Sequence, residues 1–289
     1  MSYKLQRKII VCVFLAVPVL LLVTFTVIPF FKLLHMSFAD WDGFSPSYQL
    51  VGVKNYVTTF SSPNVWISLR NNCVYILASL LQNILGLYLA VVLTKKIKGR
   101  NFFRSAIFIP YIINSVAVAF IFNYMYSYDY SPINMALVSL GQEPIKFLSD
   151  TGIVNYSLAF ISLWRFLGYT IVVYIAAIES LPVDIYEASM IDGANKWQEF
   201  RYITAPGISR IISLNLFLCI SGSLQAFVDP LILTKGGPGY ASSTFVTYLI
   251  NAAFTYNQYS LAAAMSVILI IVTVTVTVLQ RRITDKLFG

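Results

Sequence analysis

The stretch EASMIDG at residues 187–193, followed by ITAP at residues 203–206, decides how the rest of this 289-residue chain is interpreted. It lies in a polar, charged interruption of a sequence in which 58% of residues are hydrophobic and only 11% are charged. Soluble domains carry about 25% charged residues, so this composition excludes an ordinary globular protein. A segment with so much charge cannot lie in hydrocarbon, and we expect it to face water and a partner.

Six apolar runs around this interruption are long enough to cross a bilayer, which takes about 20 residues. They lie at about residues 9–34, 73–93, 105–126, 154–178, 211–233 and 260–279. The run that begins at Ile9 is longer than a signal-peptide core and has no small-residue cleavage site after it, so we interpret it as a retained span. We therefore expect an all-α integral membrane protein with six transmembrane helices and a single domain over residues 1–289.

The Lys and Arg residues lie mainly on one side of these spans. Fourteen of the 20 share that side, namely Lys4, Arg7, Lys8, Lys95, Lys96, Lys98, Arg100, Arg104, Lys196, Arg201, Arg210, Arg281, Arg282 and Lys286. Because loops rich in Lys and Arg stay in the cytoplasm, both termini and the 187–206 stretch are expected to be cytoplasmic. The net charge of +8 thus follows membrane topology, and no nucleic-acid partner is expected.

The local sequence of the interruption predicts two short helices. Residues 183–192 form the first, and Gly193 suits the left-handed position after a helix end. Asn195 and Gln198 have the spacing of a capping box that opens the second helix. We expect Pro206 to end that helix.

Acidic residues concentrate in this segment. Five of the twelve in the chain fall here, namely Glu179, Asp184, Glu187, Asp192 and Glu199. One explanation is a solvated loop whose carboxylates favour helix starts. The other is docking onto a basic partner surface, where Glu187 accepts a charge-assisted hydrogen bond.

The spacing within this loop resembles the cytoplasmic coupling loop of importer-type ABC transporter permeases. In that family Glu-Ala-Ala is followed after three residues by Gly, and after nine more by Ile, one residue and Leu-Pro. Here the loop of about residues 180–207 departs at Ser189, which replaces the third Ala, and at Ala205, which replaces Leu. The resemblance implies that this loop touches the ATPase through Glu187, Ala188, Ser189, Asp192, Gly193, Ile203 and Pro206.

Much of the remaining chain resembles the sugar branch of the same family, which includes maltose, glycerol-phosphate and multiple-sugar permeases. The matching segments are residues 37–43, 51–56, 104–110, 233–239 and 262–264. The resemblance implies the ABC importer permease fold in the cell membrane. It also implies docking of an extracellular solute-binding protein at Gly236, Gly237 and Pro238.

Such an importer pairs two permeases with two ATPase subunits. The resemblance thus implies a heterodimer with a second permease, in which the binding protein delivers a sugar. The chain has no Gly-x-x-x-x-Gly-Lys-Ser/Thr phosphate-binding loop, so ATP and Mg are expected on the partner ATPase. We expect no catalytic residue, cofactor or metal site in this chain, whose cysteines are scattered without paired spacing.

Polar residues inside the predicted spans mark a candidate substrate pathway, because such residues are costly unless they face a cavity. Arg165 lies about eleven residues, or roughly 16 Å, into its span, and Tyr169 follows on the same face. The fifth run holds Ser223, Gln225 and Asp229. Aromatic faces and planar hydrogen-bonding groups suit a sugar. The alternative is a buried Arg165–Asp229 ion pair that joins two helices, and both roles can coexist.

A single basic residue in this set favours a neutral sugar over a phosphorylated one, and the many aromatic residues favour two or more rings. The leading hypothesis is therefore the permease subunit of an ATP-driven importer of a disaccharide or oligosaccharide. The alternative is a proton- or ion-coupled carrier, which would need several intramembrane carboxylates or an inverted repeat. An integral membrane enzyme would need clustered Asp, His or Cys, and the sequence shows neither pattern.

Overall fold

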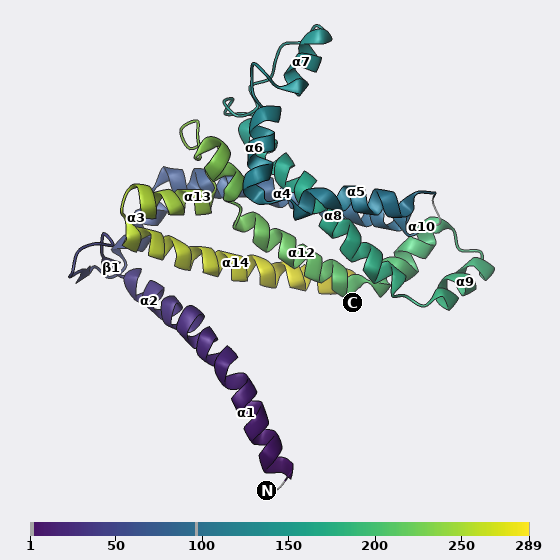
Figure 1. The fold of residues 1–289 in the computed structure, drawn as a ribbon, viewed down its shortest axis with the longest axis horizontal. Coiled ribbons are helices and arrows are strands. Elements are labelled where there is room, and N and C mark those ends of the chain that lie inside the picture. Colours follow the sequence, from purple (N-terminus) through teal and green to yellow (C-terminus); the bar gives the residue numbers. More distant parts are fainter. Residues whose placement is uncertain (1–2, 96–97, 289) are drawn as a thin grey trace. The chain divides into compact units, whose positions relative to one another are not determined.

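The computed structural model describes residues 3–95 and 98–288, so Lys96 of the basic set and the extreme ends of the predicted domain lie outside the described residues (Figure 1). Helices dominate this part of the chain. Its only strands are β1, Ala39–Asp40, and β2, Gln49–Leu50, which pair antiparallel. The predicted all-α class is confirmed.

The described chain divides into two compact units, Met1–Ser62 with Leu249–Ile270, and Pro63–Tyr248 with Ile271–Gly289. The single domain predicted over residues 1–289 stays a prediction. The helices that belong to the first unit alone are α1, Tyr3–Leu22; η1, Val23–Val27; α2, Ile28–Met36; α3, Lys54–Ser61; and η4, Asn251–Thr255. Two more, α13, Phe245–Ile250, and α14, Tyr259–Phe288, run through both units.

The second unit contains the helices that form the candidate site. They are α4, Pro63–Leu93; α5, Arg100–Ile112; α6, Ser115–Met125; α7, Pro132–Ser139; α8, Val154–Glu179; α9, Val183–Ile191; α10, Lys196–Glu199; η2, Phe200–Thr204; α11, Ala205–Gly207; α12, Ser209–Leu224; and η3, Pro230–Thr234. Here η marks a π-helical turn.

Four stretches are each long and apolar enough to cross a membrane, namely Gln6–Met36, Pro63–Leu93, Val154–Glu179 and Tyr259–Thr284. The third predicted span is instead two helices, α5 and α6, that meet at 98°. The break lies at Asn114, whose side chain accepts a hydrogen bond from Val116 N at 2.8 Å and so caps a new helix.

The fifth predicted span is also interrupted. A bend of 72° between Lys196–Gly207 and α12 lies just before its predicted start at residue 211. The apolar run to residue 233 does not continue as one helix, because α12 ends at Leu224 and η3 follows after a break. Counting each bent pair as one span gives six. The sequence therefore predicted the apolar runs but not their bends.

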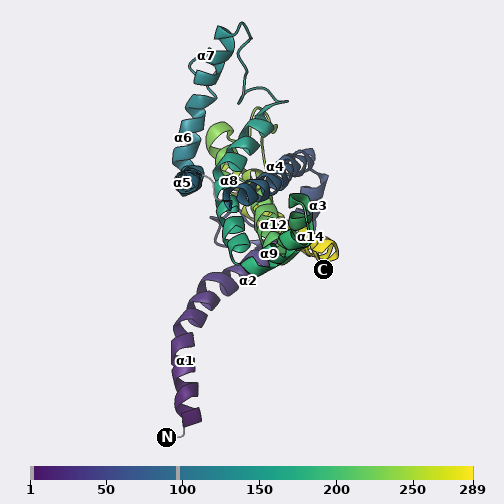
Figure 2. The same ribbon diagram turned by 90° about the vertical axis from the view of Figure 1, so that its right-hand side faces the viewer.

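Close packing joins α4, α5 and α8, which lie side by side (Figures 1 and 2). Gly168 makes this possible, because a Cβ there would collide with the backbone carbonyl of Ile107 on α5. Gly86 plays the same part between α4 and α8, where a Cβ would meet the Thr170 side chain. Small residues allow membrane helices to approach in this way.

Candidate functional site

The predicted coupling loop forms a helix–glycine–helix protrusion. Gly193 has φ of +76° after α9, and Ala194 N donates to Ser189 O at 3.0 Å. The capping box is present: Asn195 Oδ1 accepts from Trp197 N and Gln198 N, while Asn195 N donates to Gln198 Oε1 at 2.8 Å. Both local predictions are confirmed, since they depend only on neighbouring residues.

The predicted helix end at Pro206 is confirmed to within one residue, because the segment that begins at Lys196 ends at Gly207. Proline lies in the first turn of α11, after the π-helical turn η2, and the helix continues to Gly207. A proline disrupts the hydrogen bond that its N–H would have made and crowds the preceding turn. The wider turn of η2 lets the chain pass this position before α12 begins at Ser209.

The exposed face of this protrusion carries both charge and apolar side chains. Glu187 and Asp192 are exposed, as are Ala188, Gly193 and Pro206. Large apolar side chains lie beside them: Ile191 is 86% exposed, Tyr202 70% and Trp197 65%. An apolar patch of this kind on a water-facing segment is typical of a protein–protein contact surface.

Two of the predicted loop residues face inward instead. Ser189 is buried, and its hydroxyl donates to Tyr186 O at 2.8 Å, while Ile203 is half-buried. Tyr186 and Thr204 share a hydrogen bond of 3.1 Å between the two halves of the protrusion. These residues hold the protrusion together rather than presenting a surface.

An ion pair fixes the base of the protrusion. Arg104 Nη2 of α5 lies 2.7 Å from Glu179 Oε1 at the end of α8, and it also donates to Leu93 O of α4 at 2.8 Å. Three helices are thus joined directly before the protrusion begins. The sequence did not predict this contact, because the partners are 75 residues apart.

The five predicted pathway residues line one cavity of about 350 Å³ within the second unit. Arg165 and Tyr169 enter it from α8, and Ser223, Gln225 and Asp229 enter it from the end of α12 and the segment that follows. The Tyr169 ring stacks on Tyr111 of α5 at 4.9 Å. The sequence therefore identified a real spatial cluster, although it predicted no cavity shape.

Several polar atoms in this cavity have no partner among the described residues. Tyr75 Oη, Arg165 Nε and Asp229 Oδ1 are buried without a hydrogen bond. Asp229 Oδ2 accepts from Ser162 Oγ at 3.4 Å. Buried polar groups are usually paired, so unpaired ones around a cavity mark places for a polar ligand or water.

The predicted ion pair between Arg165 and Asp229 is absent from the described structure, in which no nitrogen–oxygen distance between them falls within 4.0 Å. The Arg165 guanidinium instead lies over the Phe166 ring, 4.8 Å from its centroid. The two side chains are therefore not in direct contact, although their opposite charges interact across the cavity.

Other lining residues were missed by sequence reasoning. They are Tyr75, Ser79 and Gln82 of α4, Tyr111 of α5 and Ser162 of α8. Gln82 Nε2 donates to Thr170 Oγ1 of α8 at 2.7 Å, so it also forms part of the wall. A polar residue within an apolar run was the available signal, but periodicity alone did not show which face of α4 meets α8.

The loop holding Gly236, Gly237 and Pro238 is tied to the same helices. Asn71 Nδ2 of α4 donates to Ser243 O at 2.9 Å, and Asn155 Nδ2 of α8 donates to Ala241 O at 2.6 Å. Gly236 has φ of +87°, which favours glycine. The loop is therefore held in one shape, with Pro238 exposed.

The part of the chain that the structure describes contains no group of three or more His, Cys, Asp or Glu side chains placed to hold a metal ion. The cavity is lined by polar and aromatic side chains, and the protrusion exposes both charged and apolar side chains.

Comparison with known proteins gives the family. The family model described as "Binding-protein-dependent transport system inner membrane component" matches residues 82–289. The chain is 35% identical to the probable ABC transporter permease protein YurN of Bacillus subtilis, over 91% of this chain and 92% of that protein. It is 33% identical to the probable starch degradation products transport system permease protein AmyD of Thermoanaerobacterium thermosulfurigenes, over 94% and 93%.

A solved structure has the same fold. It is described as a bacterial ABC transporter involved in the import of the acidic polysaccharide alginate. The match has a TM-score of 0.86 and covers 99% of this chain and 98% of that one, at 22% identity. The predicted permease fold is confirmed.

Proposed function

Because the chain belongs to the family of inner membrane components of binding-protein-dependent transport systems, we propose that it passes a neutral disaccharide or oligosaccharide through the membrane as half of a permease pair. The observation that carries the sugar assignment is the cavity of about 350 Å³ with its unpaired polar atoms. Its size falls within the about 300–1,000 Å³ of small-molecule sites.

The chemistry of the cavity supports a sugar. Tyr169 and Tyr111 offer aromatic faces for the C–H face of a ring, and Gln225 and Ser223 offer neutral hydrogen-bonding groups. Arg165 can donate hydrogen bonds to the oxygens of sugar hydroxyl groups, and Asp229 can accept hydrogen bonds from those groups. The name of the AmyD relative refers to starch degradation products, and this supports a saccharide substrate here.

We assign the energy source to separate subunits. The Glu187 protrusion is the proposed contact with one of the two ATPase subunits, which would hold ATP and Mg, and this chain would be non-catalytic. The exposed Ile191, Trp197 and Tyr202 support that role, because a loop that only solvated its carboxylates would not expose them. The remaining proposed partners are a second permease and an extracellular binding protein that docks at Gly236, Gly237 and Pro238.

The proposed sidedness, with the protrusion and both termini in the cytoplasm, is supported by the distribution of the basic residues. The loop at Gly236 then lies outside. A proton- or ion-coupled carrier is disfavoured, because the cavity offers only one carboxylate, Asp229.

Purification of the chain in mild detergent from its native membrane tests the proposal. We expect an ATPase subunit, a second permease and a binding protein to copurify, and the ligand retained by that binding protein to be a saccharide. Recovery of the chain alone, or with a binding protein that holds a non-saccharide ligand, would contradict the proposed function.

A further inference from the structure

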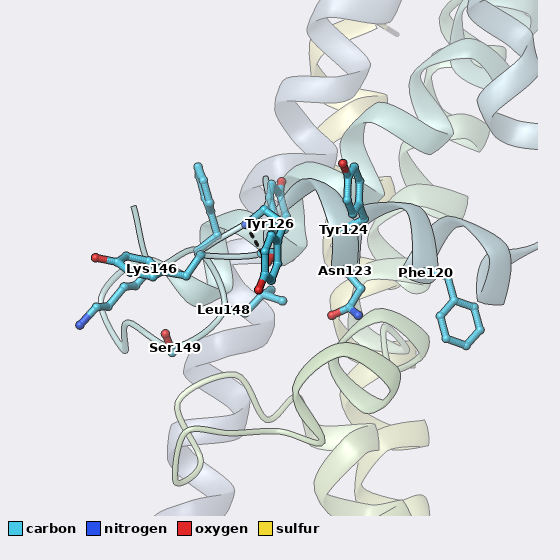
Figure 3. A pocket seen from close by; sticks show the side chains of 11 residues that line it. Phe120, Asn123, Tyr124, Tyr126, Lys146, Leu148 and Ser149 are labelled. Atoms are coloured by element: carbon cyan, nitrogen blue, oxygen red, sulfur yellow. Dashed lines mark hydrogen bonds between the residues drawn. The ribbon is translucent and has the colours of Figure 1, made fainter. Parts of the chain in front are cut away.

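A second pocket lies in the same unit, where α6 ends and the loop before α8 returns (Figure 3). Its volume is about 440 Å³, and it shares no lining residue with the span cavity. We propose that this pocket is a carbohydrate subsite that takes a sugar ring on the outer side of the membrane. The proposal rests on the proposed function, since it concerns the sugar that the permease would pass.

Aromatic side chains line the pocket, and the buried ring of Tyr126 is held in place. The Tyr126 ring stacks on Phe147 at 4.8 Å with an angle of 20°, and its hydroxyl donates to Ser157 O of α8 at 3.1 Å. Tyr124 and Tyr128 line the pocket and are exposed. Flat, exposed tyrosine rings suit the C–H face of a pyranose, while their hydroxyls reach its hydroxyl groups.

One buried side chain, Asn134, holds together the two segments that line the pocket, residues 127–128 and 145–146. Asn134 Nδ2 donates to Ser127 O at 3.2 Å, to Tyr128 O at 3.2 Å and to Ile145 O at 3.0 Å. Its Oδ1 accepts from Ile145 N at 2.9 Å. A buried amide bonded in this way joins the segment after α6 to the segment that carries Lys146. The pocket is therefore built before any ligand arrives, as small-molecule sites usually are.

The polar groups of the lining suit a neutral, hydroxyl-rich ligand. Lys146 is the one charged side chain among the residues that line the pocket, and its ammonium lies 5.6 Å from the centroid of the Tyr128 ring. Asn123 and Ser149 add neutral donors and acceptors. No carboxylate lines it, so a cationic ligand finds no counter-charge.

Tyrosines also gather at membrane–water interfaces, where they anchor a helix in the lipid headgroups. That role does not require the segments on the two sides of a hollow to be fixed to each other. Stacking of Tyr126 on Phe147 and the four bonds of Asn134 fix them, which favours a discrete ligand over a belt of separate anchors.

Saturation-transfer NMR on the complete transporter in nanodiscs, without the binding protein, tests the subsite. The probes are maltotriose, trehalose and diacetylchitobiose. The test variant combines Tyr128→Ala with Lys146→Met, two exposed positions where no folding defect is expected. Met135→Ala, an exposed residue of α7 outside the pocket, is the matched control, and Tyr169→Ala reports on the span cavity.

We expect at least one sugar to show a saturation-transfer signal with wild type and with Met135→Ala. The Tyr128→Ala, Lys146→Met variant should bind it about two- to tenfold more weakly, as expected for a lost aromatic contact. Tyr169→Ala should retain part of the signal. A signal unchanged in the double variant, or none from any sugar in wild type, overturns the subsite. A phospholipid retained by wild type and lost from the double variant, with no sugar signal, also overturns it.

Sugar uptake by wild-type transporter in vesicles, with the binding protein present, separates the two proposals. Uptake together with an unchanged signal in the double variant means that the subsite alone is wrong. If no sugar enters, the proposed function itself is wrong.

Discussion

Tyr75 Oη, Arg165 Nε and Asp229 Oδ1 are buried beside the span cavity without a hydrogen-bond partner among the described residues. An unpaired buried polar group costs about 1–3 kcal/mol. A ligand that forms hydrogen bonds with these atoms would remove this free-energy penalty, and the gain would favour binding over the empty site. At the scale of the residue, the proposed substrate contact thus depends on the polar groups that the described structure leaves unpaired.

Arg165→Ala should reduce sugar uptake at least about tenfold while the complex still assembles, because the guanidinium makes no ion pair that joins helices. Arg70→Ala, an exposed arginine of α4 outside the cavity, is the control with the same charge change. Uptake in vesicles and copurification of the subunits are the two measurements. Loss of assembly in the Arg165 variant alone would show a structural role instead.

Glu187→Lys should leave the chain inserted in the membrane and lower binding-protein-stimulated ATP hydrolysis at least about tenfold. The carboxylate is exposed, and its proposed charge-assisted bond to the ATPase would become a repulsion. Glu143→Lys makes the same charge change in an exposed loop far along the chain from the protrusion. Transport at the wild-type rate in the Glu187 variant would remove the docking role.

Asp42 gives the loop after α2 a defined response to pH. Hydrogen bonds from Ser45 N and Phe44 N, together with the Ser45 hydroxyl, lower the pKa of this carboxyl to about 2 from 3.8. A lowered folded-state pKa stabilises the turn above pH 3.8, and that contribution is lost as pH falls toward 2.

Hydrogen exchange at Phe44 and Ser45, corrected for intrinsic rates, should therefore be constant from pH 7 to pH 4 and rise below that. The variant Asp42→Asn keeps an acceptor oxygen but does not titrate, so its corrected exchange should not change over the same range. Equal pH dependence in both proteins would show that Asp42 does not hold the turn.

At the scale of the element, close helix approach determines where the cavity lies. Tyr111 of α5 reaches Tyr169 of α8 because Gly168 lets the two backbones meet. The bends at Asn114 and at Ile208 then turn the neighbouring helices away from a straight path. A straight six-helix bundle drawn from the apolar runs would lack both features.

Gly168→Ala should destabilise the protein by about 1–3 kcal/mol, because its Cβ would collide with a backbone carbonyl that no rotamer change can move. Gly222→Ala is the matched helical control, since nothing lies within 4 Å of a Cβ there. Thermal unfolding of the purified complex compares the two. Equal midpoints would mean that α5 and α8 can separate without cost.

At the scale of the whole molecule, the distribution of basic residues predicts which loops face the cytoplasm. Single cysteines introduced at Asn195 and Pro238, both exposed, should be labelled from opposite sides of the membrane, after the native cysteines are replaced. In right-side-out vesicles, an impermeant maleimide should label the Pro238 position and spare the Asn195 position. Labelling of both, or the reverse pattern, would contradict the predicted orientation.

The sequence by itself determined the features that depend on local order or composition. The apolar runs followed from hydropathy, and the Gly193 turn and the Asn195 capping box followed from residues a few positions apart. The spacing of the loop from Glu187 to Pro206 was enough to recognise the family. Arg165 and Asp229 were found because a charged residue in an apolar run is costly wherever it faces.

Tertiary structure alone decided the features that join distant segments. The contact of Arg104 with Glu179, the clamp on the loop after η3 by Asn71 and Asn155, and the pocket held by Asn134 all depend on which helix faces meet. Sequence periodicity is weak in membrane helices, because the lipid-facing and protein-facing sides are both apolar. The direction of each face, and hence the shape of each cavity, is therefore fixed only when the helices pack.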